Sequence, residues 1–482
     1  MKKKTVAALL ALTCTLGACG AKENTPLETA APITTEQEPA VEPIASEEIS
    51  APETVAETPE VPAAEEAAAS EQVEETLPLT GCGVTENLTE GIEKIDAPDA
   101  KITDAQTQAL SRASMQLFAE TVAFEGKHPN VLLSPTSIAI AFGMTENGAA
   151  GDTLKDMERV VGGGITIDEM NPLLYHLSDR LRNAKEVDWN VANSVWFRDD
   201  GMWKVNDEFA AKALSWYGAD VWKAPFDDTT KDAINGWVSE QTKGMIPEVI
   251  DRIPPEAGMY LINALAFEGE WMEQYEDGQI LENRKFTNAD GSQSDVTMLS
   301  SGENAYFELE GGTGFLKDYK GGEYSFMGLL PEEGTDLDAY IASLAAGDAD
   351  LAEAIRNCSY GEVIVQIPEF TKDYRVEMVD IFEDMGMSLP FLQGLAEFPN
   401  MMETIDGSPY DVWIGNVLHK THIEVDRVGT RAAAVTVIEM DRCMAVAPVE
   451  DPVKVILDRP FIYGIIDNET GLPVFLGCVN SL

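Results

Sequence analysis

Basic residues are scarce in this chain. Among its 482 residues, 33 are Lys or Arg and 84 are Asp or Glu, so the formal net charge is -51 at neutral pH. Proteins bind nucleic acids through clustered Lys and Arg side chains that neutralise phosphates. We therefore expect no nucleic-acid partner.

Histidine and cysteine, the common ligands of transition metals, are also rare, with four His and six Cys. His419 and His422 are three residues apart in a segment with strand alternation, which places them on opposite faces. No pair of cysteines has the spacing of a metal site. We therefore predict no metal site and no cofactor, and we interpret Cys358 and Cys478 as buried thiols that behave as small hydrophobic residues.

The N-terminus lacks an apolar run long enough to cross a membrane. Three Lys precede an apolar run over residues 6–12, which is typical of a secretory signal peptide and too short for a membrane span. Shortly after this run, the letters LGAC at residues 16–19 resemble a bacterial lipobox whose Cys is lipidated. We predict a signal peptide over residues 1–18 and lipidation of Cys19; the alternative is a plain signal peptide with an incidental Cys.

Aromatic residues are absent from residues 21–78, and Lys22 is the only basic residue there. Such an acidic, Pro-rich segment cannot bury enough surface to offset the entropy of ordering. We therefore predict that residues 19–100 form a disordered tether. A flexible coil of roughly 60 residues spans about 45 Å. The expected location is lipid-anchored at the outer face of a bacterial cell membrane, with the domain extracellular.

Globular patterns begin near residue 101. Thr103 or Asp104 can cap a helix that presents an apolar stripe, and residues 187–197 alternate as a strand. Helices come first and strands dominate the second half, so we predict an α+β domain over residues 101–482. Continuous apolar runs predict four strands covered on both faces, at residues 259–267, 324–330, 363–367 and 461–466.

A segment near the C-terminus has the pattern of a strand with no obvious place in a sheet. Beginning at Gly429, it places Thr430, Ala432 and Ala434 on one face, while the other face ends in charged residues. Its second half contains charged residues and leads into prolines, which is typical of an exposed loop. A segment of this kind suits a bait for a protease, because one half can enter a sheet while the other is offered to solvent.

Blocks of sequence on both sides of this segment identify a family. GTRAAAVT at residues 429–436 is followed by DRPFIYGIID at 458–467 and LPVFLGCVN at 472–480. With the upstream blocks, they closely resemble the serpins over nearly everything from residue 101 onward. The resemblance implies the serpin fold, with three β-sheets, about nine helices and an exposed reactive-centre loop. The upstream blocks are NVLLSPTSIAIAFGMTENGAAGDTLKDM (130–157), NVANSVWF (190–197), INGWVSEQTKGMIPEVI (234–250), LINALAFEGEW (261–271), IPEF (367–370) and VLHKTHIEVD (417–426).

The resemblance also implies the function of an inhibitor rather than an enzyme. A protease would attack the loop and form its acyl-enzyme. The part of the loop on the N-terminal side of the cut, which we call the arm, would then enter the central sheet and trap the protease. The matching hinge residues are Gly429, Thr430, Ala432, Ala433 and Ala434.

The chain departs from the family around this hinge. Arg427 and Arg431 stand where acidic residues are usual, and Val435 replaces a small residue. Because Arg431 and Val435 fall on the outward face of the arm, we expect slower insertion rather than none.

Counting along the arm places the scissile bond between Cys443 and Met444, with the neighbouring bonds beginning at Arg442 and Met444 as alternatives. Cys443 as the recognised side chain favours elastase-like proteases, which is our preferred interpretation. Arg442 would favour trypsin-like proteases, and Met444 chymotrypsin-like ones.

Four polar residues match a cluster that the family places beneath the central sheet: Ser134, Ser137, Asn263 and His419. A hydrolase with Ser and His as nucleophile and base is the alternative, but no G-x-S-x-G motif surrounds either serine. Trp271 matches the family's Trp near the top of the sheet, in the breach where the arm begins to insert.

Two functions follow. The first is a surface-tethered, irreversible inhibitor of serine endopeptidases, with cysteine endopeptidases as a second target class, which protects a bacterial cell. The second is a non-inhibitory binding protein on the same fold. We expect a monomer in either case.

Overall fold

The computed structural model describes residues 85–98, 101–199, 201, 203–253, 257–347, 349–405, 407, 411–430 and 452–482. The predicted signal peptide, Cys19, most of the predicted tether and the predicted scissile bond lie outside these residues.

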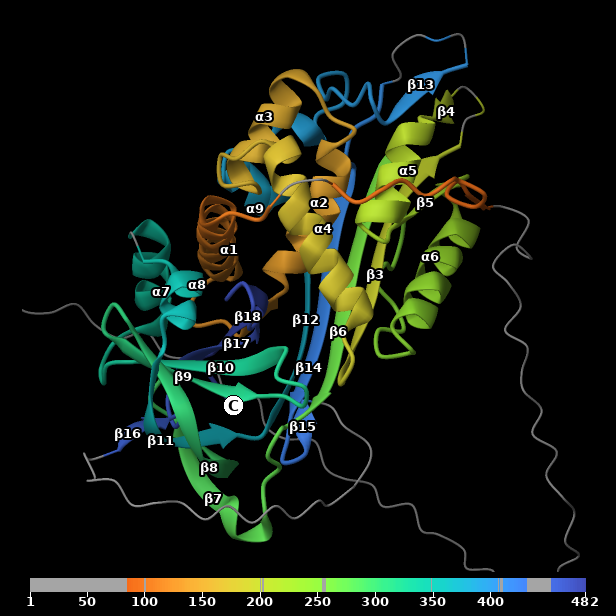
Figure 1. The fold of residues 1–482 in the computed structure, drawn as a ribbon. Helices are drawn as coiled ribbons and strands as arrows, with labels where there is room; N and C mark the ends of the chain where they lie inside the picture. The colour runs from red at the N-terminus through yellow and green to blue at the C-terminus, as the bar shows by residue number, and fades with distance from the viewer. Residues whose placement is uncertain are drawn as a thin grey trace, which may run out of the picture. The chain divides into compact units, whose positions relative to one another are not determined.

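Three β-sheets organise the described residues (Figure 1). One of them has seven strands, and we call it the central sheet. In spatial order its strands are β1 (Glu86–Asn87), β5 (Asp220–Ala224), β3 (Val187–Arg198), β6 (Met259–Glu270), β15 (Gly429–Thr430), β14 (Asn416–Val425) and β12 (Phe370–Glu377).

A nine-stranded sheet packs beside it, and a two-stranded sheet completes the set. The nine strands are β16 (Val453–Ile456), β11 (Ser359–Pro368), β8 (Gln293–Leu309), β9 (Gly312–Asp318), β10 (Tyr324–Pro331), β17 (Phe461–Asp467), β18 (Pro473–Val479) and β2 (Val131–Leu133), with β7 (Ile280–Thr287) paired to β8. The two-stranded sheet joins β13 (Met402–Thr404) to β4 (Trp203–Val205).

The described residues form nine α-helices, so the predicted α+β fold with three sheets and about nine helices is confirmed. Among them, no helix has both the length and the apolar content needed to cross a membrane. The helices are α1 (Asp104–Glu125), α2 (Pro135–Glu146), α3 (Gly151–Val160), α4 (Ile167–Asn183), α5 (Asp207–Trp216), α6 (Asp228–Gln241), α7 (Leu337–Ala346), α8 (Leu351–Arg356) and α9 (Val379–Asp384). Two short 3₁₀-helices, η2 (Asp277–Gln279) and η3 (Leu389–Phe391), lie in connections.

Helix α1 begins where its capping residues predict. Thr103 accepts a hydrogen bond from the backbone of Gln106, and the Gln106 side chain accepts one from the backbone of Thr103, which is a capping box. The predicted stripe is buried, including Leu117 and Phe118. The cap and the stripe together therefore determine both the start and the inward face of α1.

The central sheet is covered on both faces because it separates two apolar clusters. Leu261 and Leu265 of β6 join the larger cluster with α1, α2 and α4, whereas Tyr260 and Ile262 join the cluster beneath α6. Figure 1 shows α6 on the opposite side of β3 and β6 from α2 and α4. The prediction of full burial is confirmed for this run of β6 and for β10 and β17.

Strand β11 corrects one expectation. Val363, Val365 and Ile367 are buried, but Ile364 and Gln366 between them are only half-buried. The strand is therefore covered fully on one face only. A short apolar run cannot distinguish these cases, because its outward residue happens to be Ile.

The two described cysteines differ. Cys478 in β18 is fully buried as predicted, and burial raises the pKa of its thiol to about 12. Cys358 is only half-buried, so the prediction of burial is wrong there. Both thiols are free of disulfides among the described residues.

Residues 85–98, which the sequence assigned to the tether, pack on the domain as an N-terminal strap. Strand β1 pairs antiparallel with β5, the Leu88 amide donates to the Val221 carbonyl at 2.7 Å, and the Trp216 indole donates to the Asp96 carbonyl at 2.8 Å. The boundary predicted at residue 100 therefore lies before residue 85. Backbone pairing at a sheet edge needs no apolar pattern, which is why the sequence did not reveal the strap.

Candidate functional site

The central sheet contains a seam between β6 and β14. Residues 416–422 of β14 pair in parallel with residues 260–266 of β6. Beyond this stretch the two strands are separated by β15, the first part of the predicted hinge (Figure 1). Its residues pair antiparallel with the end of β6, and Thr430 also pairs with Val425 of β14. The arm therefore already has its first two residues within the seam.

Residue size explains why these two positions fit. A Cβ on Gly429 would lie 2.1 Å from the Gly269 carbonyl oxygen, so the close approach to β6 requires glycine. Thr430 is fully buried, and its hydroxyl lies 2.6 Å from the hydroxyl of Tyr319. The one polar atom of this side chain is thus satisfied inside the sheet.

Trp271 lies beside the turn that leads into β15. Its indole donates to the Asp426 carbonyl at 2.8 Å, and its amide donates to the Val428 carbonyl at 3.0 Å. The ring is fully buried and stacks on Tyr319, with centroids 4.7 Å apart. The predicted breach residue therefore contacts the hinge through hydrogen bonds and through a shared aromatic neighbour.

A buried cation beneath this Trp was not foreseen. The Lys317 ammonium lies 5.4 Å from the Trp271 ring and 4.6 Å from the Tyr275 ring, and it pairs with Glu303 at 2.9 Å. Lys317 is 2% exposed. Cation–π contacts and the ion pair offset the desolvation of the ammonium. Nothing in the local sequence distinguishes this Lys from a solvated one.

Arg427 finds an acidic partner. Its guanidinium lies 3.5 Å from the Glu369 carboxylate, which stands just before β12. In the same turn, the Asp426 carboxylate accepts hydrogen bonds from the amides of Val428 and Gly429 at 2.7 and 3.0 Å. Hydrogen bonds of Asp426 therefore hold the turn that precedes the hinge, and Arg427 forms an ion pair there although acidic residues are usual at its position in the family.

The four predicted polar residues come together at the seam. Asn263 and His419 are direct partners across the parallel pairing, with the Asn263 amide oxygen 2.8 Å from His419 Nδ1. His419 Nε2 accepts from the Ser134 amide at 3.0 Å, so Nδ1 carries the hydrogen and donates. The Asn263 amide nitrogen donates to the Ser137 carbonyl at 3.0 Å and to its hydroxyl. Full burial lowers the pKa of His419 to about 3, so the ring is neutral.

Asn193 is a further member that the sequence did not reveal. It faces Asn263 across β3 and β6, and its side-chain oxygen accepts from the Asn263 amide at 2.7 Å. The Ser134 hydroxyl caps α2 through the Ser137 amide, and His419 Nε2 is occupied by a backbone amide. The cluster thus joins α2 to three strands, and the atoms needed for a nucleophile and base are engaged elsewhere.

The remaining predicted residues of the arm lie outside the described residues: Ala432, Ala433, Ala434, Arg442, Cys443 and Met444. Strand β16 resumes at Val453 and pairs in parallel with β11. The undescribed loop therefore connects the seam of the central sheet to an edge strand of the nine-stranded sheet.

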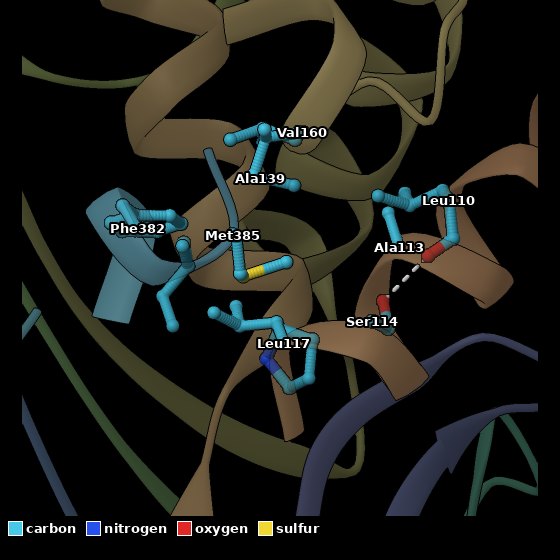
Figure 2. A pocket seen from close by; sticks show the side chains of 11 residues that line it. Leu110, Ala113, Ser114, Leu117, Ala139, Val160, Phe382 and Met385 are labelled. Atoms are coloured by element: carbon cyan, nitrogen blue, oxygen red, sulfur yellow. Dashed lines mark hydrogen bonds between the residues drawn. The ribbon is translucent and has the colours of Figure 1, made fainter. Parts of the chain in front are cut away.

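A separate small pocket, with a cavity volume of about 10 Å³, lies between α1, α2, α3 and α9 (Figure 2). Its labelled side chains are mostly apolar, including Leu110, Leu117 and Phe382, and the Ser114 hydroxyl donates back to the Leu110 carbonyl at 2.7 Å. Substrate sites normally combine apolar walls with free polar groups that orient a ligand. The pocket lacks this combination.

Comparisons of the sequence with known proteins identify the family. A family model described as Serpin (serine protease inhibitor) matches residues 108–482. Iripin-8 of Ixodes ricinus is 29% identical over 369 residues, which cover 73% of this chain and 88% of Iripin-8. Neuroserpin of Homo sapiens is 28% identical over 393 residues, which cover 77% of this chain and 90% of neuroserpin.

Solved structures extend the comparison. The thermophilic serpin tengpin in its native state is 36% identical, with a TM-score of 0.74 and coverage of 83% of this chain and 100% of that chain. Its latent state is 34% identical, with a TM-score of 0.66 and coverage of 80% and 99%. The family model alone spans more than half of the sequence. The chain therefore belongs to the serpin family of serine protease inhibitors.

Proposed function

We propose that the protein is an irreversible suicide inhibitor of serine endopeptidases, with cysteine endopeptidases as a second target class. The observation that carries this proposal is β15, because Gly429 and Thr430 already occupy the start of the seam between β6 and β14. A severed arm continuing from Thr430 would extend this strand along the seam. The central sheet would then gain a full strand and carry the attached protease with it.

The protease itself supplies the nucleophile for the trapping reaction. Its nucleophile attacks the carbonyl carbon of the recognised residue, the peptide bond breaks, and the following residue leaves as a protonated amine. The arm remains joined to the protease through an ester, or through a thioester for a cysteine protease. Insertion must then displace the protease before water hydrolyses this bond.

The pairing pattern of the seam favours insertion. A strand that continues β15 runs antiparallel to both neighbours, so it would replace one parallel ladder by two antiparallel ladders. Antiparallel pairing is slightly more stable per residue than parallel pairing. Insertion must also separate Asn263 from His419, whose side chains bond directly across the seam. We therefore propose that this polar cluster controls how readily the seam opens.

The composition of the arm supports the same proposal. Thr430 faces the buried side, and strand alternation places Ala432 and Ala434 on that face. These small side chains enter a packed sheet at little steric cost. Arg431 and Val435 would fall on the opposite face, where a slower insertion is the expected consequence.

The test is to mix the soluble domain with elastase, trypsin and chymotrypsin and to look for an adduct that resists SDS. Inhibition predicts such an adduct with at least one protease, together with release of a C-terminal peptide. Cleavage without an adduct by every protease would contradict inhibition and favour the alternative, a non-inhibitory binding protein on this fold.

The target specificity follows from the same released peptide. We propose cleavage between Cys443 and Met444 and an elastase-like target, so the peptide should begin at Met444. A peptide beginning at Cys443 would indicate recognition of Arg442 and a trypsin-like target, and one beginning at Ala445 would indicate a chymotrypsin-like target. N-terminal sequencing distinguishes the three.

We further propose that the inhibitor is exported and anchored through a lipid on Cys19, which supplies membrane attachment while the domain is monomeric. Several acyl chains on one residue would anchor it stably, because each buried methylene contributes about 0.8 kcal/mol. Fatty-acid labelling in the producing bacterium should depend on Cys19. Equal labelling of Cys19→Ser would contradict the assignment.

A further inference from the structure

Outside the seam, three metal-binding side chains converge from distant parts of the sequence. His128 lies in the turn between α1 and β2, Asp336 caps α7, and Asp338 lies in the first turn of that helix. His128 Nδ1 is 3.1 Å from an Asp338 oxygen, and His128 Nε2 is 3.8 Å from an Asp336 oxygen. One ligand atom from each residue lies within 4.8 Å of the others. We propose that this group binds a divalent transition metal of the zinc class.

Both carboxylates are held in place before any ion binds. Asp336 accepts a hydrogen bond from the Ala339 amide at 3.0 Å. Asp338 accepts one from the His128 amide at 2.7 Å through Oδ2 and one from the Asn480 side chain at 3.1 Å through Oδ1. Contacts of this kind orient metal ligands and reduce the entropy that binding costs.

An unpartnered polar atom at the same place provides further support. His128 Nδ1 is inaccessible to solvent and has no hydrogen-bond partner of acceptable geometry among the described residues, despite the nearby carboxylate. A buried polar atom without a partner is costly, and a bound cation would satisfy the lone pair of this nitrogen.

The chemistry of the donors selects the ion. Two carboxylates and a neutral imidazole carry a net charge that one dication neutralises. Imidazole favours zinc-like ions over calcium or magnesium, which prefer all-oxygen sites. A tetrahedral zinc site separates neighbouring ligand atoms by about 3.4 Å, and the 3.1 Å contact between His128 and Asp338 is close to this value.

The site is also open to an entering ion. The side chains of His128 and Asp338 are 20% and 22% exposed, and that of Asp336 is 52% exposed. Asp336 Oδ2 accepts no hydrogen bond from the helix, since the Ala339 amide donates to Oδ1, so this oxygen is available to an ion. Bound metal would tie the turn after α1 to the start of α7.

Isothermal titration of the metal-free full chain with zinc chloride tests the proposal. We expect a site of one Zn²⁺ per chain whose affinity falls at least 10-fold in His128→Ala and in Asp338→Asn. His422→Ala is the matched control, because His422 also contacts a carboxylate, that of Asp373 at 2.7 Å, but only one. The control should bind zinc as the parent does.

Two further measurements identify the ligands directly. The first uses the parent protein and so does not depend on the folding of a variant, and the second detects binding of the metal by cysteines. In the parent labelled with ¹⁵N-histidine, zinc should shift the resonance of one of the four histidines, and that resonance should be missing in His128→Ala. The cobalt complex should lack a thiolate charge-transfer band. Unchanged titration curves for both site variants, or a zinc shift at any other histidine alone, would overturn the proposal.

Discussion

At the scale of single residues, Thr430 is the position where the proposed mechanism is most sensitive to charge. Its side chain is fully buried against Tyr319. We predict that Thr430→Arg converts the protein from an inhibitor into a substrate, because burying an unpaired charge costs several kcal/mol. The measurement is the fraction of cleaved protein that becomes an SDS-resistant adduct.

Thr371→Arg is the matched control for this variant, since Thr371 lies exposed on β12 of the same sheet. It should leave the adduct fraction unchanged. If Thr430→Arg formed adduct as efficiently as the parent, Thr430 would not need to insert.

Glu146 at the end of α2 is a buried acid that predicts an unusual dependence of stability on pH. Burial, followed by the charge of Glu158, raises its pKa from the ordinary value of 4.5 to about 8. Between these values the folded state holds a proton that the unfolded state has lost, so stability falls as the pH rises through this range and levels off above pH 8.

We therefore predict that the unfolding free energy of the parent falls by about 3 kcal/mol between pH 5 and pH 8. This fall should be absent in Glu146→Gln. Urea unfolding at both pH values measures this difference. Glu383→Gln, an exposed change on α9, should retain the slope of the parent. A parental slope in Glu146→Gln would show that this carboxyl does not titrate as burial implies.

Sequence reasoning at this scale succeeded where a residue sits in a recognisable block and failed where its role depends on distant neighbours. Ser134, Ser137, Asn263 and His419 were identified and converge as expected. Lys317, by contrast, reads as an ordinary charged strand residue, because its aromatic and acidic partners come from other strands or loops.

At the scale of elements, the N-terminal strap predicts a measurable contribution to stability. It covers the edge of β5 and donates or accepts hydrogen bonds with Val221, Ser215 and Trp216. A chain beginning at residue 99 should be less stable by about 2 to 4 kcal/mol, since each hydrogen bond contributes about 1 kcal/mol. Thermal unfolding measures this loss.

A chain beginning at residue 80 is the control, because it keeps the strap and removes only what precedes it. Its melting temperature should match that of the full chain. Equal melting temperatures for the two truncated chains would mean that the strap contributes nothing to the stability of the domain.

Elements with strong local signals were predictable, and elements defined by pairing were not. The capping box of Thr103 and the apolar stripe behind it determine α1 without outside help. The strap is held by backbone hydrogen bonds to β5, which leave no periodic pattern in the two-residue strand β1. The strand pattern that begins at Gly429 was predicted, but the pairing of β15 with β6 and β14 was not. Residue patterns report which face is buried, but they do not report which strand lies alongside.

At the scale of the whole molecule, family resemblance predicted three sheets and about nine helices but not the order of the strands. The central sheet places β5, β3, β6, β14 and β12 in an order that departs from the chain order. Periodicity predicts strands and helices separately and contains no information about this order. The strand order is therefore a result of the structure, and the matched solved structures confirm the fold.

The most direct measurement compares the thermal unfolding of the intact protein with that of the protein nicked within the reactive-centre loop. If the arm continues β15 along the seam, about ten new backbone hydrogen bonds at about 1 kcal/mol each raise the melting temperature by about 10 °C. Nicked protein that unfolds at the same temperature as intact protein would contradict insertion of the arm.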